Sequence, residues 1–475
     1  MRSRGTVLTA VTLLAVIVPT GAQAAALEGA ALGWQWALPF IGLILTIALA
    51  PRLAPRLWHR HYGKLAFVWA TFAVVPLAAT YDVETARAAF LHAFFAEYLS
   101  FIVLLFALYV VAGGILITGN LRGTPLVNTA ILALGTLIAS LVGTTGAAMI
   151  LVRPLVRANS ARLNNAHVIV FFIFLAANIG GSLTPIGNPP LFVGFLNGVD
   201  FFWTAQHLAA PTVFVAGLVL AIFIAVDIWL YREDRRITTV GEVRPPTRLV
   251  LRGGINFLLI VSIVAAILAS AMWRPGVVVT VDGTALELQN LLRDAVLLLI
   301  AVLSLIVTPN EHREANGFTW EPIVEVAILF GAIFACLIPV LAMLKAGPDG
   351  AFAWLLAAAA PAGRANEVAY FWLSGALSAF LDNAPTYLVF FTLAGGDPAE
   401  LMTRLAPTLA AISMGATYMG ALTYIGNAPN LMIRTIAEER GIKMPGFFGY
   451  MAWAGVVLIP VFVLVTLLFV GRGLP

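Results

Sequence analysis

The apolar positions of this chain fall into long runs that never pause long enough to enclose a soluble domain. A membrane-spanning helix needs about 20 apolar residues. By that criterion the sequence predicts ten spans, at 35–50, 65–81, 94–117, 168–195, 208–230, 255–273, 291–308, 323–344, 405–433 and 450–471. The expected fold is therefore an all-α polytopic membrane protein.

Three arginine-rich loops predict the orientation of these spans. Arg52–Lys64 and the loop that carries Arg153, Arg157 and Arg162 hold basic residues without any acid, and Arg232–Arg252 holds six arginines against three acids. The excess of basic residues in cytoplasmic loops places all three segments in the cytoplasm. We therefore expect a protein of the cell (inner) membrane whose mature N-terminus lies outside the cytoplasm.

Two further apolar stretches, 126–152 and 366–395, are interrupted midway. The orientation is consistent only if 126–152 is a re-entrant hairpin that enters and leaves on the cytoplasmic side, with its turn at Gly143–Gly146. The stretch 366–395 is then a second hairpin from the opposite side, with its turn at Leu381–Pro385. Non-helical backbone at this depth is tolerated only inside protein or beside a wet cavity.

The N-terminal segment 1–24 has the pattern of a secretory signal. Arg2 and Arg4 form a charged start, Thr6–Thr20 is a short apolar core, and Ala22–Ala24 fits a small-x-small cleavage site. The alternative is a first helix that is not cleaved.

An internal repeat is the strongest signal in the sequence. Gly181–Pro190 has the sequence GSLTPIGNPP and Gly420–Pro429 has GALTYIGNAP, so seven of ten positions match at a separation of 239 residues. The same separation places Thr144 on Asn383, which makes the two hairpin turns equivalent. Because the hairpins enter from opposite sides, the repeat is inverted, and inverted repeats with broken helices at mid-membrane are typical of secondary transporters.

The repeat divides the chain into five expected parts. These are a signal segment (1–24), a first helix with its loop (25–64), the first repeat (65–231), a basic linker with a helix and an outer loop (232–290), and the second repeat (291–475). The outer loop Trp273–Asn290 is expected to form a small β-hairpin, and Phe352–Ala362 an interfacial helix.

Composition and motifs exclude several other classes of protein. Of the 475 residues 61% are hydrophobic and 11% are charged, whereas about 25% of a soluble domain is charged. The net charge is +4 and the basic residues lie in a few short loops, which is typical of membrane topology, so no nucleic-acid partner is expected. The sequence contains no HExxH, C-x-x-C, GxSxG or Walker motif, so neither an enzyme nor a resident cofactor is expected. The single cysteine, Cys336, excludes an internal disulfide.

The two GN-containing segments are the first candidate site. Proline and glycine should unwind each helix there and free backbone groups, which can coordinate a cation at carbonyls or an anion at helix N-termini. Gly187 and Gly426 mark these breaks, and Asn188 and Asn427 would add side-chain oxygens. A packing kink, with asparagines bonding the freed backbone, is the alternative.

Asp382 is the sharpest single candidate, because a carboxylate at membrane depth is unfavourable unless it binds an ion, titrates or is paired. A capping role in the turn is compatible with ion binding. Asn383 and Thr386 lie beside it. Further candidates are the hydroxyls of the first turn and of the breaks, namely Thr144, Thr145, Thr184 and Thr423.

Acidic residues near predicted helix ends are weaker candidates. Glu97 and Glu325 each stand near the start of a long apolar helix, where they are either proton or ion groups or interfacial residues that suit the helix dipole. Asp227, at the end of a span, is expected to form a surface ion pair with the arginine-rich loop.

The LDNAPT hairpin, the GNPP and GNAP breaks and the glutamate before ILFGAIF resemble the ion transporter superfamily, from about Leu65 onward. That superfamily includes NhaD-type sodium/proton antiporters, citrate and dicarboxylate transporters, and arsenite permeases. The resemblance implies a homodimer with a scaffold domain and a moving transport domain of elevator type. It also implies that Asp382 and Asn383 are cation ligands, with Thr386 nearby and Asn188 and Asn427 at the breaks.

The sequence thus favours an antiporter that exchanges sodium or lithium for protons, with Asp382 binding either one. The hairpin tips lack the Ser-Asn-Thr signature of the dicarboxylate branch, so a sodium- or proton-coupled citrate or dicarboxylate transporter is the second hypothesis. Arsenite export, a membrane-embedded enzyme and a scaffold are weaker alternatives. The expected partners are the lipid bilayer, a small cation or carboxylate, and a second copy of the chain.

Overall fold

The computed structural model describes residues 27–119, 121–237 and 250–471, so the predicted signal segment lies outside the described residues. The first half contains α1 (Leu38–Leu53), α2 (Pro55–Thr80), α3 (Val83–His92), α4 (Leu99–Gly113), α5 (Pro125–Val142), α6 (Thr144–Ala158), α7 (Ala166–Leu175), α8 (Pro189–Leu196) and α9 (Trp203–Ile237). Short helical turns occupy Gly29–Ala31, Trp34–Ala37, Ala93–Tyr98 and Ile179–Leu183 (η4).

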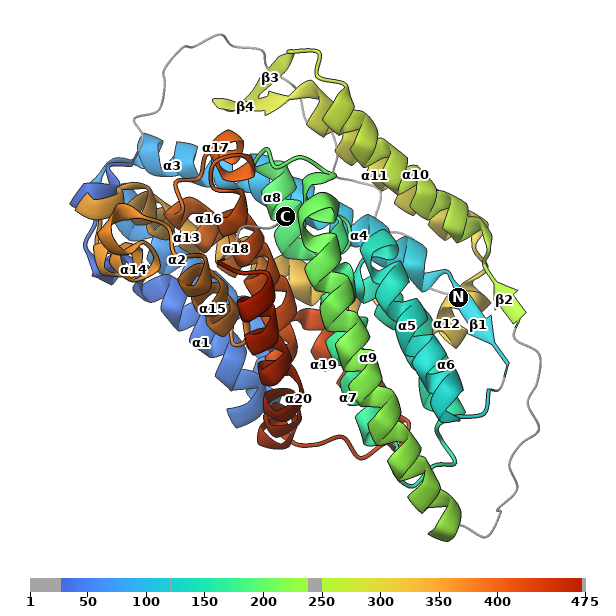
Figure 1. Cartoon of the computed structure of the whole chain (residues 1–475). Coiled ribbons are helices and arrows are strands. Elements are labelled where there is room, and N and C mark those ends of the chain that lie inside the picture. The colour runs from blue at the N-terminus through green and yellow to red at the C-terminus, as the bar shows by residue number, and fades with distance from the viewer. Residues whose placement is uncertain (1–26, 120, 238–249, 472–475) are drawn as a thin grey trace.

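The second half is also helical (Figure 1). It contains α10 (Ile255–Met272), α11 (Leu288–Val307), α12 (Asn310–Ala315), α13 (Glu321–Lys345), α14 (Ala353–Ala359), α15 (Glu367–Ser378), α16 (Asn383–Leu393), α17 (Pro398–Met402), α18 (Ala406–Tyr418), α19 (Ala428–Glu439) and α20 (Phe447–Leu468). Short turns lie at Gly347–Asp349, Pro361–Gly363 and Met419–Leu422 (η7). Four short strands complete the described structure, β1 (Leu116–Thr118) in the first half, and β2 (Val250–Arg252), β3 (Val278–Val281) and β4 (Thr284–Glu287) in the second.

Ten helical segments of the described chain are long and apolar enough to cross a membrane, which confirms an all-α polytopic membrane protein. Nine of them coincide with spans predicted from the sequence. The tenth is α5, the first helix of the interrupted stretch 126–152. The predicted span 405–433 is not among the ten, because its break divides it into α18 and α19, each shorter than 18 residues.

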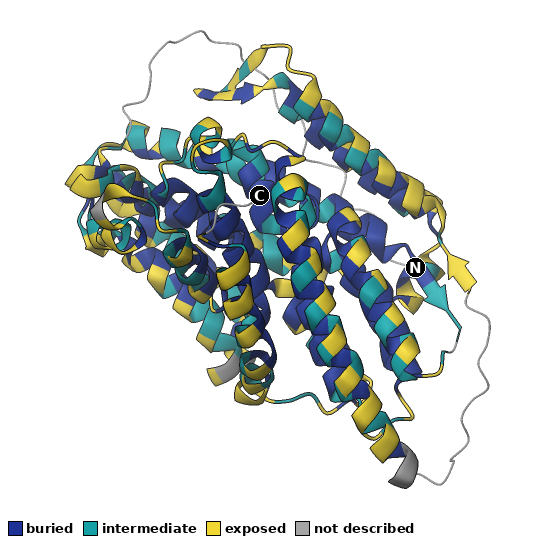
Figure 2. Ribbon diagram, in the orientation of Figure 1, coloured by how far each residue is buried: buried dark blue, intermediate teal, exposed yellow. Residues whose placement is uncertain are grey.

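The helices at the periphery expose apolar side chains, as lipid contact requires. Figure 2 shows exposed residues along α10 and α11, and large apolar side chains such as Val261, Leu299 and Ile306 are more than half exposed there. In contrast, α7 and α18 lie in the interior, and every residue from His167 to Leu175 is buried. The two broken helices therefore form the centre of the molecule.

Both broken helices are interrupted in the same way. After η4 and η7 the chain becomes extended at Thr184 (φ −140°, ψ 156°) and Thr423 (φ −136°, ψ 164°). It is extended again at Asn188 (φ −141°, ψ 135°) and Asn427 (φ −155°, ψ 137°), where α8 and α19 begin. Both threonines and both asparagines are 239 residues apart, so the separation found in the sequence is repeated in the backbone conformation.

The interrupted stretches form helical hairpins, α5 with α6 and α15 with α16. The first turn is tighter than the predicted Gly143–Gly146, because α6 already begins at Thr144 and Gly143 alone makes the turn. Gly143 has φ 79°, a conformation that favours glycine. In the second hairpin Asp382 caps α16 at the equivalent position. Whether the hairpins are re-entrant in a bilayer stays a prediction.

The loops gather at two ends of the molecule. At one end β3 and β4 form the predicted hairpin, and the Asp282 carboxylate pairs with Arg87 of α3. At the other end β1 pairs with β2. The predicted topology puts the loops that carry Arg87 and β3–β4 together on the outer side, and the loops that carry β1 and β2 together on the cytoplasmic side.

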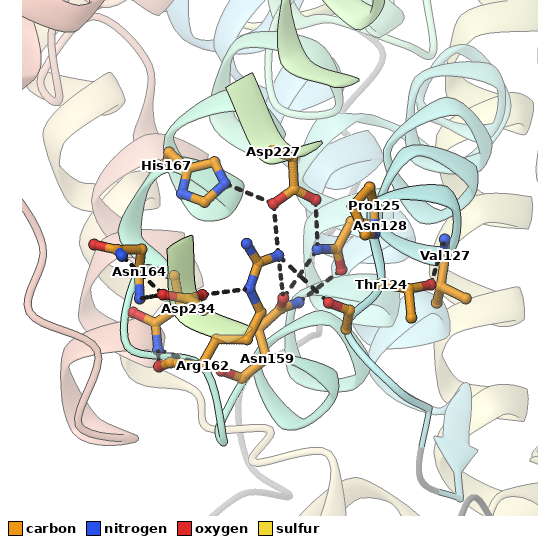
Figure 3. A network of polar contacts seen from close by, with 12 residues as sticks. Thr124, Pro125, Val127, Asn128, Asn159, Arg162, Asn164, His167, Asp227 and Asp234 are labelled. Carbon is orange, nitrogen blue, oxygen red and sulfur yellow. Dashed lines mark hydrogen bonds and ion pairs between the residues drawn. The ribbon is translucent and has the colours of Figure 1, made fainter. Parts of the chain in front are cut away.

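A buried polar network anchors the base of the first hairpin (Figure 3). Asp227 of α9 accepts hydrogen bonds from Arg162 (2.5 Å) and from Asn128 of α5 (3.0 Å), and it lies 2.8 Å from Nε2 of His167 on α7. Asn128 also exchanges hydrogen bonds with Asn159, the residue that ends α6. The network thus joins both ends of the hairpin to α7 and α9.

The ion pair predicted for Asp227 is present, but its predicted location at the surface is wrong. The ion pair with arginine exists, but its partner is Arg162 and the Asp227 side chain is 0% exposed. Asp227 is enclosed because α9 packs against α5 and α7 at this depth. Asp234, about two helical turns further on, binds Arg162 (3.2 Å) and Asn164 (2.7 Å) in the same network.

Asp227→Asn should destabilise the protein, because the buried Arg162 guanidinium loses one of its two carboxylate partners and keeps only Asp234. Removing one partner of a buried pair costs about 3–5 kcal/mol. Thermal unfolding of the purified protein in detergent should show a clear fall in the melting temperature. The control is Glu84→Gln, which removes an exposed partner of Arg87 and should leave the melting temperature almost unchanged. Equal melting temperatures for all three proteins would contradict this account of the network.

Candidate functional site

The two hairpin turns and the two helix breaks meet around one pocket. Its lining includes Gly143 and the start of α6 from the first hairpin, Asp382 of the second hairpin turn, Gly187 of the first break and Asn427 of the second. The far wall is apolar and comes from α4 and from the first turns of α13. Segments that are far apart in the sequence therefore share one site, as the internal repeat predicts.

The pocket lies toward the end of the molecule that carries β1 and β2. Its lining from α6 and α19 consists of their first turns, and both helices run from the pocket to that end. Its lining from α4 comes from the half of that helix nearer Gly113, just before β1. The pocket therefore lies between the two helix breaks and the β1–β2 end of the molecule.

Asp382 supplies the negative charge of the pocket. No lysine, arginine or histidine is among the described residues that line it, and Asp382 is the one carboxylate there. One oxygen of Asp382 accepts a hydrogen bond of 3.3 Å from the Ala384 backbone N–H at the start of α16. This is a long, weak bond, so most of the hydrogen-bonding capacity of the carboxylate is available to the pocket.

The first turn contributes backbone geometry and a hydroxyl. The Thr144 N–H donates to the Gly187 carbonyl (2.9 Å), which ties the hairpin turn directly to the first break. Thr144 is buried, and Thr145 is partly exposed toward the pocket. The structure therefore brings both predicted threonines to the pocket, together with Asp382, Gly187 and Asn427.

Asn383 links the second turn to the first break. Its Nδ2 donates to Oδ1 of Asn188 (3.0 Å), and both side chains are fully buried. Its Oδ1 is buried without a hydrogen-bond donor among the residues that the structure describes. A buried oxygen in that state costs about 1–3 kcal/mol. Asn383, like Asn188 and Gly426, is not among the residues that line the pocket. Its amide oxygen is of the kind that a hard cation binds, and Asn383 directly follows Asp382 in the chain.

Asn178 and Asn430 join the two breaks and were not predicted from the sequence. Asn178 Nδ2 donates to Asn430 Oδ1 (2.8 Å), and Asn427 donates to Asn178 Oδ1 (3.2 Å). Asn430 Nδ2 in turn donates to the Gly420 and Thr423 carbonyls (both 2.9 Å). In the sequence each of them is marked only as an asparagine next to apolar residues, which does not identify its partner in the other half.

The break threonines have a structural role rather than a place in the pocket. Thr184 Oγ1 donates to the Ser140 carbonyl at the end of α5, and it accepts from the Gly187 N–H (3.1 Å). Thr423 repeats both bonds, to the Ala379 carbonyl and from the Gly426 N–H (3.1 Å). Each break is thereby fixed to the first helix of the hairpin in its own half.

The remaining candidates lie away from the pocket lining. Thr386 is buried in α16 and donates to the Asp382 carbonyl (3.2 Å), so it supports the turn. Glu325 accepts a hydrogen bond from Trp58 of α2 (3.1 Å), at the contact between α2 and α13. Glu97 lies in the π-helical turn before α4. The structure does not bring these two glutamates to Asp382.

The donor set of the pocket is composed of oxygens. No group of three or more His, Cys, Asp or Glu side chains that could hold a metal ion occurs among the described residues. One carboxylate with amide, hydroxyl and carbonyl oxygens suits an alkali cation or a proton. The first turns of α6, α8 and α19 also face the pocket, and helix N-termini favour anions.

Comparison with known families covers almost the whole chain. A family model described as "Putative citrate transport" (CitMHS_2) matches residues 29–470. No curated protein shows a significant match to this chain.

Gly426→Ala should disrupt the second break, because the glycine is enclosed by backbone. A Cβ atom there would lie 2.6 Å from the Gly420 oxygen and 2.8 Å from the Ser378 oxygen, and neither can move freely. Overpacking of this kind costs about 1–3 kcal/mol, so the melting temperature in detergent should fall. Gly455→Ala on α20 is the matched control, since nothing lies within 4 Å of its new methyl group. A variant of Gly426 as stable as this control would show that the break is not tightly packed.

Proposed function

We propose that this chain, which belongs to the citrate transport family, is a secondary transporter that exchanges sodium or lithium for protons. Asp382 is the group that binds the cation or the proton. One observation carries the proposal: a lone carboxylate lines a pocket in which the described residues place no basic side chain. A cation or a proton is what such a carboxylate binds at membrane depth.

Competition at Asp382 is sufficient to couple the two fluxes. A carboxylate that holds a proton has lost the charge that attracts sodium, and one that holds sodium cannot readily be protonated. If the empty, charged site crosses the membrane slowly, each crossing carries one of the two ions. The unpaired Oδ1 of Asn383 and the hydroxyls of Thr144 and Thr145 are the further oxygens offered to the cation.

The packing supports a moving unit that carries the site. The hairpins and the broken helices pack on one another, α5 on η4, α15 on α18 and α16 on α8. A different set packs around them, with α1 on α2, α2 on α13, and α10 and α11 on α4. We propose that the first set moves as a rigid body against the second, in an elevator-type mechanism and in a homodimer.

The second candidate function is cation-coupled transport of citrate or a related carboxylate. It is favoured by the family's description and by the helix N-termini that face the pocket. In this case the cation at Asp382 would offset the charge of the carboxylate substrate. The topology proposed with either function places the β1–β2 end in the cytoplasm and the protein in the inner membrane.

Asp382→Asn should abolish cation-dependent proton movement in proteoliposomes that contain a pH dye and a preset proton gradient. Asparagine caps a helix about as well as aspartate, so the variant should keep the turn and lose only the charge. Wild-type protein should collapse the gradient when sodium or lithium is added. The exposed Asp349→Asn is the control and should behave as wild type.

The same vesicles discriminate between the two functions. Exchange retained in Asp382→Asn would remove this carboxylate from the mechanism. If neither sodium nor lithium moves protons, but labelled citrate enters in a sodium- or proton-dependent way, the substrate is a carboxylate and the antiport proposal fails.

A further inference from the structure

A cluster of arginines lies beyond the pocket, where α6 and α19 end. The two helices pack against each other and run from the pocket toward the β1–β2 end. Arg153 and Arg157 lie one turn apart on the same face of α6, and Arg440 follows the last residue of α19. At about 1.5 Å per residue, Arg153 lies about 14 Å along the helix axis from the Thr144 turn.

Both arginines of α6 have buried N–H groups that the described protein does not satisfy. Arg153 Nη2 makes a long hydrogen bond to the Gly317 carbonyl (3.4 Å), while Nη1 is buried without a partner. Arg157 Nη2 donates to the Ile117 carbonyl (2.6 Å), while Nε is buried without a partner. Buried donors on charged groups normally have acceptors, so an acceptor is needed here.

The charged groups around Arg153 and Arg157 are mostly positive, which favours a bound anion. Arg440 lies close enough to both arginines to act on them electrostatically, and Glu439 is the one acid that acts on Arg153. Burial lowers the pKa of Arg153, and the charge of Arg440 lowers it further. The pKa of Arg157 is lowered by the same two causes. The preference for basic residues in cytoplasmic loops explains exposed arginines. It does not explain why three arginines lie close together, two of them with buried N–H groups that have no acceptor.

We propose that Arg153 and Arg157, with Arg440 at the rim, form a binding site for an oxyanion. The ligand is the carboxylate or phosphate group of a soluble anion or of an anionic lipid, because a guanidinium binds both groups through paired N–H donors. The site is separate from that of Asp382, since none of the three arginines lines the pocket. Tyr109 lies between the two sites, because it lines the pocket and is close enough to Arg153 for an electrostatic interaction.

The test measures binding to the purified full chain in detergent, so it needs no transport. Citrate, inorganic phosphate and micelles doped with phosphatidylglycerol are titrated separately, with thermal stabilisation as the readout. Arg153→Gln and Arg157→Gln should each weaken binding about tenfold or more, as expected for loss of a charged hydrogen-bond donor. Arg153→Lys keeps the charge but not the planar fork, so it should bind with intermediate affinity. Arg122→Gln, an exposed arginine, is the control.

The outcomes distinguish a soluble anion from a lipid headgroup, and they test oxyanion binding independently of the proposed cation exchange. Binding of citrate or phosphate that depends on Arg153 and Arg157 assigns the site to a soluble anion. Dependence seen only with phosphatidylglycerol assigns it to a lipid headgroup. No binding of any of the three, or binding that both glutamine variants leave unchanged, overturns the proposal. The readout is dependence of anion binding on Arg153 and Arg157, and none of the three arginines lines the Asp382 pocket, so failure of cation exchange at Asp382 leaves this test intact.

Discussion

The structure depends on satisfying the backbone of two broken helices in the interior of a membrane protein. Unpaired N–H and carbonyl groups are strongly unfavourable there, and each break frees several of them. Four buried asparagines donate to backbone carbonyls there, Asn178, Asn188, Asn427 and Asn430. Thr184 and Thr423 accept hydrogen bonds from backbone N–H groups of the breaks. Asn178 and Asn427 connect the two halves directly, so the two breaks form one polar centre.

The position of the pocket follows from this arrangement. Each break is bonded to the first helix of its own hairpin through Thr184 or Thr423, and Asn383 joins the second turn to the first break. The turns and breaks are therefore held close together, and the Asp382 carboxylate faces the space between them. At the other end of the first hairpin, the network around Asp227 holds the bases of α5 and α6. A hairpin fixed at both ends keeps Thr144 and Thr145 in place beside Asp382.

Much of this arrangement could be predicted from the sequence, because its causes are local. Apolar runs determine the helices, and proline and glycine determine the breaks near Gly187 and Gly426. The separation of 239 residues then identifies which segments are equivalent. Asp282 and Gly283 have positive φ in the turn between β3 and β4, and that hairpin was predicted from its sequence. Asn178 and Asn430 were missed because their roles depend on contacts between halves, which no local pattern records. The burial of Asp227 was missed for the same reason, since it is the packing of α9 on α5 that encloses this side chain.

The central claim is that one carboxylate binds either a proton or a cation. The most direct measurement is proton release from purified protein in a weakly buffered detergent solution that contains a pH indicator. Adding sodium or lithium to wild-type protein should release protons in a saturable way, and the same addition to Asp382→Asn should release none. Equal release from both proteins, or none from either, would contradict the claim.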